Sequence, residues 1–72
     1  MSYNEQREFT GLPARIAALE EEQATLHARV QAPEFYKEAP DAIAATLARV
    51  EQVDDELLAA YARWDELDSR AR

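Results

Sequence analysis

Residues 9–30, FTGLPARIAALEEEQATLHARV, carry a repeat of large side chains that decides the fold. The repeat advances alternately by three and four residues, which is the spacing of the inward-facing positions of a coiled coil. Its positions are Phe9, Leu12, Ile16, Leu19, Gln23, Leu26 and Val30. Only Gln23 is polar, so this stretch predicts a long helix with one nearly continuous apolar seam.

A second repeat with the same spacing occupies residues 43–64. Its positions are Ile43, Leu47, Val50, Asp54, Leu57, Tyr61 and Trp64. When the two repeats run antiparallel, Val30 faces Ile43, Phe9 faces Trp64, and all the layers between them share one register. We therefore predict an all-α fold, an antiparallel two-helix coiled-coil hairpin. Its predicted structural core is Phe9, Leu12, Ile16, Leu19, Leu26, Val30, Ile43, Leu47, Val50, Leu57, Tyr61 and Trp64.

Two polar residues, Gln23 and Asp54, interrupt these repeats in adjacent layers. An amide–carboxylate hydrogen bond between the two helices is expected there. Polar residues in a coiled-coil seam lower stability but fix register and orientation. A catalytic or metal-binding role for Asp54 is the alternative, but no partner residues for such chemistry accompany it.

The first helix is expected to be broken or kinked near Pro13. Ser2 and Glu5 have the spacing of a capping box, which starts a helix. Pro13 lacks the amide hydrogen that would bond to the carbonyl of Phe9, and Gly11 has low helix propensity. We expect helical segments at about 3–10, 13–31 and 41–69, with a kink or a single 3₁₀-like turn near residues 11–12. The bend would let the N-terminal segment, including Tyr3, wrap over the aromatic residues near position 64.

The connector of residues 31–42, QAPEFYKEAPDA, is expected to contain a short helical turn. Pro33 and Pro40 suit the first position of a helix, because their missing amide hydrogen has no intrahelical partner there. Phe35 and Tyr36 are unusually apolar for a solvated loop. We expect them to fold back over the end of the core, although an exposed aromatic tip for a partner is an alternative.

Charge and composition limit the possible functions. The chain of 72 residues has 15 Asp and Glu against 8 Lys and Arg, a net charge of −7, and no cysteine. Proteins that bind nucleic acid usually carry the opposite sign. No apolar stretch approaches the ~20 residues of a membrane span, and no signal peptide is recognisable, so a cytoplasmic location is expected.

Residues for catalysis, cofactor binding or metal binding are not apparent. The single glycine cannot form a glycine-rich phosphate loop. His27 is the only histidine and has no cysteine or second histidine near it for a metal site. We expect this chain not to be an enzyme and to bind no cofactor or metal of its own.

Arginines recur on one face of each predicted helix. Arg49, Arg63 and Arg70 share a heptad position on the second helix, and Arg15 and Arg29 share one on the first. These tracks could touch phosphates. They could equally be neutralised by neighbouring carboxylates, as in the i,i+4 pair of Glu66 with Arg70.

Four motifs, in this order and spacing, carry a family resemblance: SYNEQRE at 2–8, LPARIAALE at 12–20, PEFYKE at 33–38 and ELLAAYARWDEL at 56–67. Together they resemble the C-terminal coiled-coil domain of Uup-type ABC-F ATPases. The resemblance implies a soluble cytoplasmic parent with two ATPase domains, where ATP and Mg²⁺ would bind. It also implies that the hairpin contacts DNA, or the ribosome and its RNA.

The resemblance departs from the family at two places. Asn4 stands where the family commonly has lysine, and Thr10–Gly11 replaces a more helix-favouring pair. The candidates for phosphate contact are Arg7, Arg15, Arg29, Lys37, Arg49, Arg63 and Arg70.

The sequence thus favours an accessory hairpin of an ABC-F ATPase that contacts nucleic acid or the ribosome. The alternative is a hairpin that serves as a spacer or binds protein, including the ATPase domains of its own parent. A continuous arginine face would favour the first function, and full neutralisation by carboxylates the second. A monomer is favoured, with pairing of two copies into a four-helix bundle as a third possibility.

Overall fold

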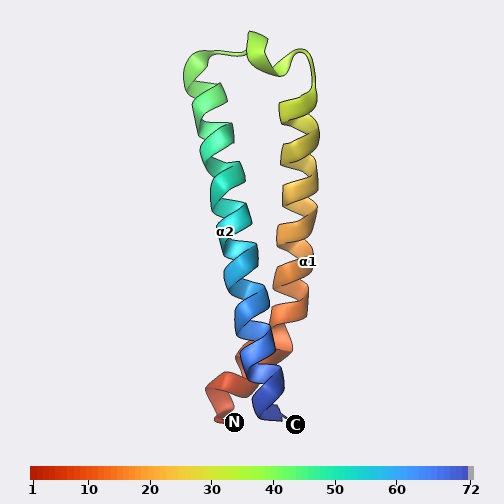
Figure 1. Cartoon of the computed structure of the whole chain (residues 1–72), viewed down its shortest axis with the longest axis vertical. Coiled ribbons are helices and arrows are strands. Elements are labelled where there is room, and N and C mark those ends of the chain that lie inside the picture. Colours follow the sequence, from red (N-terminus) through yellow and green to blue (C-terminus); the bar gives the residue numbers. More distant parts are fainter. Residues whose placement is uncertain (72) are drawn as a thin grey trace.

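The computed structural model describes residues 1–71 and is a helical hairpin (Figure 1). Helix α1 spans Tyr3–Gln31, the 3₁₀ helix η1 spans Phe35–Lys37, and helix α2 spans Pro40–Ala71. The two long helices run antiparallel, with the connector at one end and the chain ends at the other. The molecule measures 50 × 17 × 15 Å. The predicted fold class is confirmed.

Helix α1 begins with the predicted capping box. The amide of Glu5 donates to the Ser2 hydroxyl at 3.2 Å, and the Ser2 amide donates to Oε1 of Glu5 at 3.1 Å. These two bonds satisfy amides that have no partner within the helix. The local sequence therefore fixes where α1 starts.

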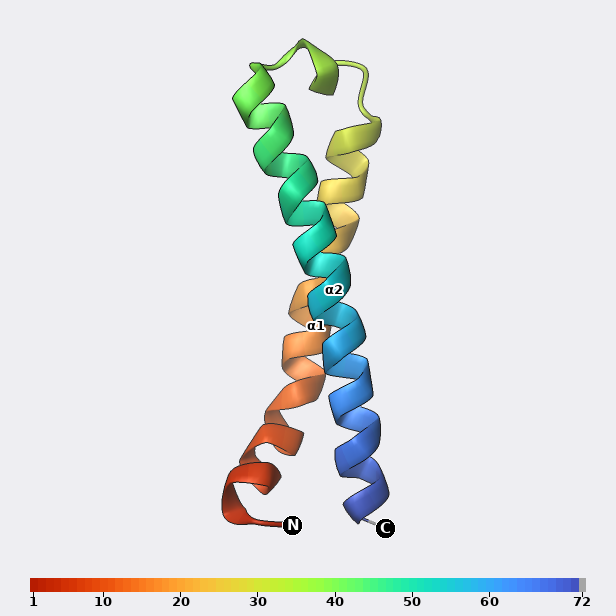
Figure 2. The same ribbon diagram turned by 60° about the vertical axis from the view of Figure 1, so that its left-hand side comes forward.

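The helix is bent but not broken at Pro13. Gly11, Leu12 and Pro13 all lie within the uninterrupted helix Tyr3–Gln31, so the predicted division into segments 3–10 and 13–31 is wrong, whereas the predicted kink is present (Figure 2). Proline removes one backbone hydrogen bond and crowds the preceding turn, which kinks a helix without necessarily ending it. Figure 2 shows the N-terminal part of α1, in red, lying at an angle to the rest of the helix.

The bend accompanies close contact between the N-terminal segment and α2, as predicted. The rings of Phe9 and Trp64 stack with their centroids 5.9 Å apart. Tyr3 does not join them, because 75% of its surface is exposed. Instead the guanidinium of Arg7 lies over the Tyr3 ring, 6.0 Å from its centroid.

The core confirms the predicted seam of α1 and corrects that of α2. Leu12 and Leu19 belong to the buried core cluster, and Phe9, Ile16 and Leu26 pack against that cluster. On α2, however, Leu47 and Tyr61 remain more than 40% exposed. The buried residues of α2 are Thr46, Val53, Leu57, Ala60 and Leu67.

The observed seam of α2 is rotated by about 60° around the helix axis from the predicted one. It follows positions 46, 50, 53, 57, 60, 64 and 67, which keeps the alternation of three and four and shares Val50, Leu57 and Trp64 with the prediction. The rotation replaces Asp54 by Val53 in the seam and brings in Leu67. Because an ionised carboxylate is costly to bury, the seam with Val53 is the more stable choice.

The connector has a short helical turn, as predicted, but the turn begins at Phe35 and not at Pro33. Phe35 is 1% exposed, so it folds back into the interior as predicted. Tyr36 is 65% exposed, so the prediction that it also covers the end of the core is wrong. The two rings meet edge to face with centroids 4.9 Å apart. Pro40 is the first residue of α2, as expected. No helix within residues 1–71 is long and apolar enough to cross a membrane.

Candidate interaction surfaces

A ladder of ion pairs joins the helices along one side of the hairpin. Arg49 of α2 donates to both carboxylate oxygens of Glu22 of α1, at 2.6 and 2.7 Å. Arg63 binds both oxygens of Glu8 in the same way, at 2.7 and 2.9 Å. Such two-point pairing matches the planar guanidinium to a carboxylate and fixes its orientation. The two guanidinium groups are therefore directed at α1, although about a third of each arginine side chain remains exposed.

Two further arginines are paired nearer the ends of the hairpin. Arg70 contacts Glu5 of α1 and donates to Glu66 on its own helix at 2.8 Å. Arg29 donates to Glu38 in the connector at 2.6 Å and lies 6.0 Å from the centroid of the Phe35 ring. Four of the seven predicted phosphate-contacting cations are thus engaged by carboxylates within the hairpin.

The other three candidates have a different environment. Within residues 1–71, Arg7, Arg15 and Lys37 form no ion pair with a carboxylate. Arg7 contacts the Tyr3 ring, and Lys37 lies in η1 at the far end of the molecule. The candidates therefore do not form one continuous basic face.

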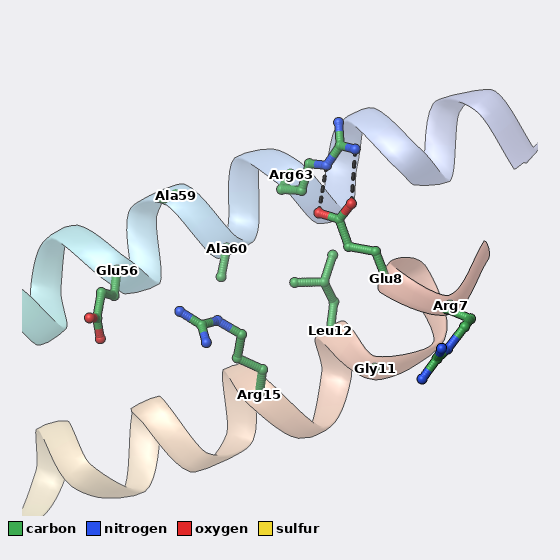
Figure 3. Close-up of a pocket in the computed structure, with 9 residues that line it drawn as sticks. All are labelled: Arg7, Glu8, Gly11, Leu12, Arg15, Glu56, Ala59, Ala60 and Arg63. Atoms are coloured by element: carbon green, nitrogen blue, oxygen red, sulfur yellow. Dashed lines mark hydrogen bonds and ion pairs between the residues drawn. The ribbon is translucent and has the colours of Figure 1, made fainter. Parts of the chain in front are cut away.

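An open groove of about 490 Å³ lies between the helices near the ladder (Figure 3). Its lining is Arg7, Glu8, Gly11, Leu12, Arg15, Glu56, Ala59, Ala60 and Arg63. In Figure 3, Arg15 extends across the groove toward Ala60 and Glu56, whereas Arg7 points away from it. The small side chains of Gly11, Ala59 and Ala60 leave the space open. Arginines and glutamates both line it, so the groove has no single charge sign.

The ladder changes the acid–base properties of its members. Hydrogen bonds from Arg63 lower the pKa of Glu8, and those from Arg49 lower the pKa of Glu22. The capping hydrogen bonds from Ser2 are the main cause of the lowered pKa of Glu5. In turn, the pairs with Glu22 and Glu8 raise the pKa values of Arg49 and Arg63. The ladder stays charged at neutral pH.

The opposite side of the hairpin carries the predicted polar contact. The Gln23 amide donates to Oδ1 of Asp54 at 2.8 Å, which confirms the expected bond between helices. Nε2 of His27 lies 4.0 Å from the same oxygen. The Asp54 side chain is 45% exposed, so it lies at the rim of the seam and not inside it as predicted. No group of three His, Cys, Asp or Glu within residues 1–71 is arranged to hold a metal ion.

Sequence reasoning missed the carboxylate partners Glu5, Glu8 and Glu22. It considered pairs along one helix, such as Glu66 with Arg70, which is observed at 2.8 Å. The antiparallel register of the two sequence repeats predicts which residues of α1 and α2 can form ion pairs between the helices. Glu22 and Arg49 lie almost opposite each other in that register, as do Glu8 and Arg63, so the partners could have been found from it.

Comparison with known proteins gives a consistent result. Residues 1–69 match the family model of the ABC transporter C-terminal domain. The chain is 37% identical over 70 residues to an ATP-binding protein Uup-like of Haemophilus influenzae, and 36% identical over 70 residues to ATP-binding protein Uup of the same organism. Each alignment covers 97% of this chain but only 15% and 11% of the respective relatives. No solved structure matches the chain.

Proposed function

The chain belongs to the ABC transporter C-terminal domain family, and from this premise we propose that it is the accessory hairpin of a longer ABC-type ATPase and acts through protein contacts. ATP and Mg²⁺ would bind in the other domains of that parent. The hairpin would hold two separated surfaces in a fixed relation, either within the parent or between the parent and a second protein. This role needs a rigid shape and no catalytic residues.

The observation that carries this proposal is the neutralisation of the arginine ladder. Arg49 and Arg63 each place two nitrogens on a glutamate of α1. A phosphate would have to displace those carboxylates, which occupy the same donors. The net charge of −7 adds repulsion at long range. Both features favour a protein partner over nucleic acid.

A second candidate function is limited contact with DNA or ribosomal RNA. It is supported by Arg7, Arg15 and Lys37, which form no ion pair with a carboxylate within residues 1–71. Each of these three cations could contact one phosphate if the nucleic-acid backbone ran along the hairpin. Because Lys37 lies at the other end of the hairpin from Arg7 and Arg15, such binding would be weak and strongly dependent on salt.

A titration distinguishes the two functions. The 72-residue chain is added to fluorescently labelled duplex DNA, single-stranded DNA and tRNA at about 50 mM and about 200 mM salt. We expect no saturable change in anisotropy for any of them. Saturable binding that weakens steeply with salt would contradict the protein-contact function.

Matched variants identify the residues if binding is seen. Arg7→Gln with Arg15→Gln removes the two arginines that have no carboxylate partner among residues 1–71, whereas Arg63→Gln removes one from the ladder. Loss of binding in the first variant alone would establish the second candidate function. Loss in the Arg63 variant as well would show that nucleic acid displaces the ladder carboxylates.

A further inference from the structure

Helix α2 has a discontinuous apolar strip that the hairpin leaves uncovered, because Glu51 and Asp54 lie between its first two members along the helix. It consists of Leu47, Leu58 and Tyr61, which are 42%, 68% and 43% exposed. At 3.6 residues per turn, these side chains fall within an arc of about 60° and extend along about 21 Å of the helix. Below, these three residues are called the α2 strip. Trp64, 36% exposed, lies one turn beyond Tyr61.

The α2 strip and the arginine ladder lie on opposite flanks of the buried seam. Arg49 and Arg63 reach Glu22 and Glu8 on one side of α1. Tyr61 instead donates its hydroxyl hydrogen to Glu20 at 2.7 Å, on the other side. The contact of Asp54 with Gln23 belongs to this second side. The paired arginines of α2 and its exposed apolar residues therefore lie on opposite sides of the hairpin.

Carboxylates without arginine or lysine partners in the described part of the chain lie within the arc of the α2 strip, at Asp54 and Asp65, and beside it, at Glu51. By helical position, Glu51, Asp54 and Asp65 lie along it, and Glu20 faces it from α1. Within residues 1–71, none of these four forms an ion pair with an arginine or lysine; Asp54 has only the neighbouring His27 at 4.0 Å. The flank thus combines exposed apolar surface with uncompensated negative charge.

We propose that the α2 strip is the binding site for a basic amphipathic helix, a partner whose apolar face is bordered by lysine or arginine. This inference rests on the proposed protein-contact function and names the chemistry of the partner. Apolar side chains of the partner would cover Leu58 and Tyr61, and its cations would meet Asp54, Asp65 and Glu20. Recognition of this kind lays one helix face along an apolar surface. A second copy of this chain fits less well, because it would bring its own carboxylates against this flank.

The single tryptophan allows a direct test with a model peptide. The probe is a helix-forming peptide of about 18 residues, or about 27 Å, with leucines on one face, lysines on the other and no tryptophan. A peptide of the same composition in scrambled order is the control. We expect a saturable change in Trp64 emission with the amphipathic peptide alone, and weaker binding as salt is raised.

Variants of exposed residues localise the site. Leu58→Gln should weaken binding about tenfold or more, because it removes the most exposed apolar contact of the strip. Ala45→Gln places the same side chain on another face of α2 and should leave the affinity unchanged. Asp65→Asn should weaken binding and reduce its dependence on salt. Both positions 45 and 58 are exposed, so equal thermal midpoints by circular dichroism would show that the fold is intact.

Several outcomes would overturn the inference. They are equal binding of the scrambled peptide, equal affinity of the Leu58 and Ala45 variants, and a dimer in sedimentation that Leu58→Gln dissociates. The last would assign the strip to a second copy. Failure with the peptide while nucleic acids also remain unbound would refute the basic partner but leave the protein-contact function in place. Saturable nucleic-acid binding would count against that function itself.

Discussion

Leu47 and Leu67 show at the scale of single residues where the seam of α2 runs. Both are leucines in the same helix, yet Leu47 is 42% exposed and Leu67 is fully buried. The free energy gained by burying a leucine side chain depends on the apolar surface removed from water. The two residues therefore contribute very differently to stability, although their helix propensity is the same.

We predict that Leu67→Ala lowers the free energy of unfolding by about 2–5 kcal/mol, as is usual for a buried leucine. Leu47→Ala should cost less than about 1 kcal/mol, because much of this side chain remains in water. Urea denaturation followed by circular dichroism measures both. A larger decrease in the free energy of unfolding for Leu47→Ala than for Leu67→Ala would support the seam predicted from the sequence and contradict the observed one.

The seam positions of α1 could be predicted from the sequence, whereas about half of those of α2 could not. In α1, only one seam collects Leu12, Leu19 and Leu26, so the periodicity leaves no choice. In α2, two adjacent stripes share Val50, Leu57 and Trp64. One stripe adds Tyr61 and Asp54, and the other adds Val53 and Leu67. The cost of burying Asp54 identifies the correct stripe, but the pattern of large apolar residues alone does not.

At the scale of the helix, Gly11 and Pro13 place two unfavourable residues within one turn of α1. Both are exposed, and the helix continues through them. Its continuity there is maintained by packing on each side, through Phe9 on Trp64 and through buried Leu12. Sequence could therefore locate the bend but not show that the helix survives it, because helix propensity does not include tertiary contacts.

The space around Gly11 makes a second prediction possible. A Cβ added at Gly11 would have no atom within 4 Å, and its φ is not positive. Gly11→Ala should therefore stabilise the protein by about 0.5–1 kcal/mol, since alanine loses less backbone entropy in a helix.

The matched control is the reverse change at an exposed position of the same helix. Ala17→Gly should destabilise by a similar amount, also measured by urea denaturation. If Gly11→Ala instead lowered stability, the bend would require a conformation that alanine resists.

At the scale of the whole molecule, carboxylates are divided between two uses. Within residues 1–71, Glu5, Glu8 and Glu22 pair with arginines of α2, whereas Glu20, Glu51, Asp54 and Asp65 on the opposite flank form no ion pair with arginine or lysine. The sequence indicated arginine tracks and a net negative charge, but it left open whether the arginines were exposed or paired. That question depends on which glutamates of α1 lie within reach of α2, and so on the three-dimensional register.

The ladder should make stability fall in acid. Glu5, Glu8 and Glu22 have lowered pKa values in the folded chain. A carboxyl group of this kind contributes stability that is complete above its ordinary pKa, about 4.3, and is lost as the pH falls through the lowered folded value. The thermal midpoint should be nearly constant from about pH 7 to about pH 5.5 and should then decrease below about pH 4.5.

Thermal melts of the chain and of Glu8→Gln with Glu22→Gln would check this dependence. The double variant should melt at a lower temperature at neutral pH and should lose less on acidification. A midpoint of the unmodified chain that rises in acid would contradict the prediction, and would mean that relief of negative repulsion outweighs the loss of the ladder.

The placement of both chain ends at one end of the hairpin has a mechanical consequence (Figure 1). Any neighbouring domain would attach at that end, so the buried Phe35 and exposed Tyr36 would lie up to 50 Å away along the longest axis. A helical pair of this length acts as a lever: a small tilt at the attachment would become a much larger sweep at the connector. A movement of an attached domain would then be transmitted over distance without any change inside the hairpin.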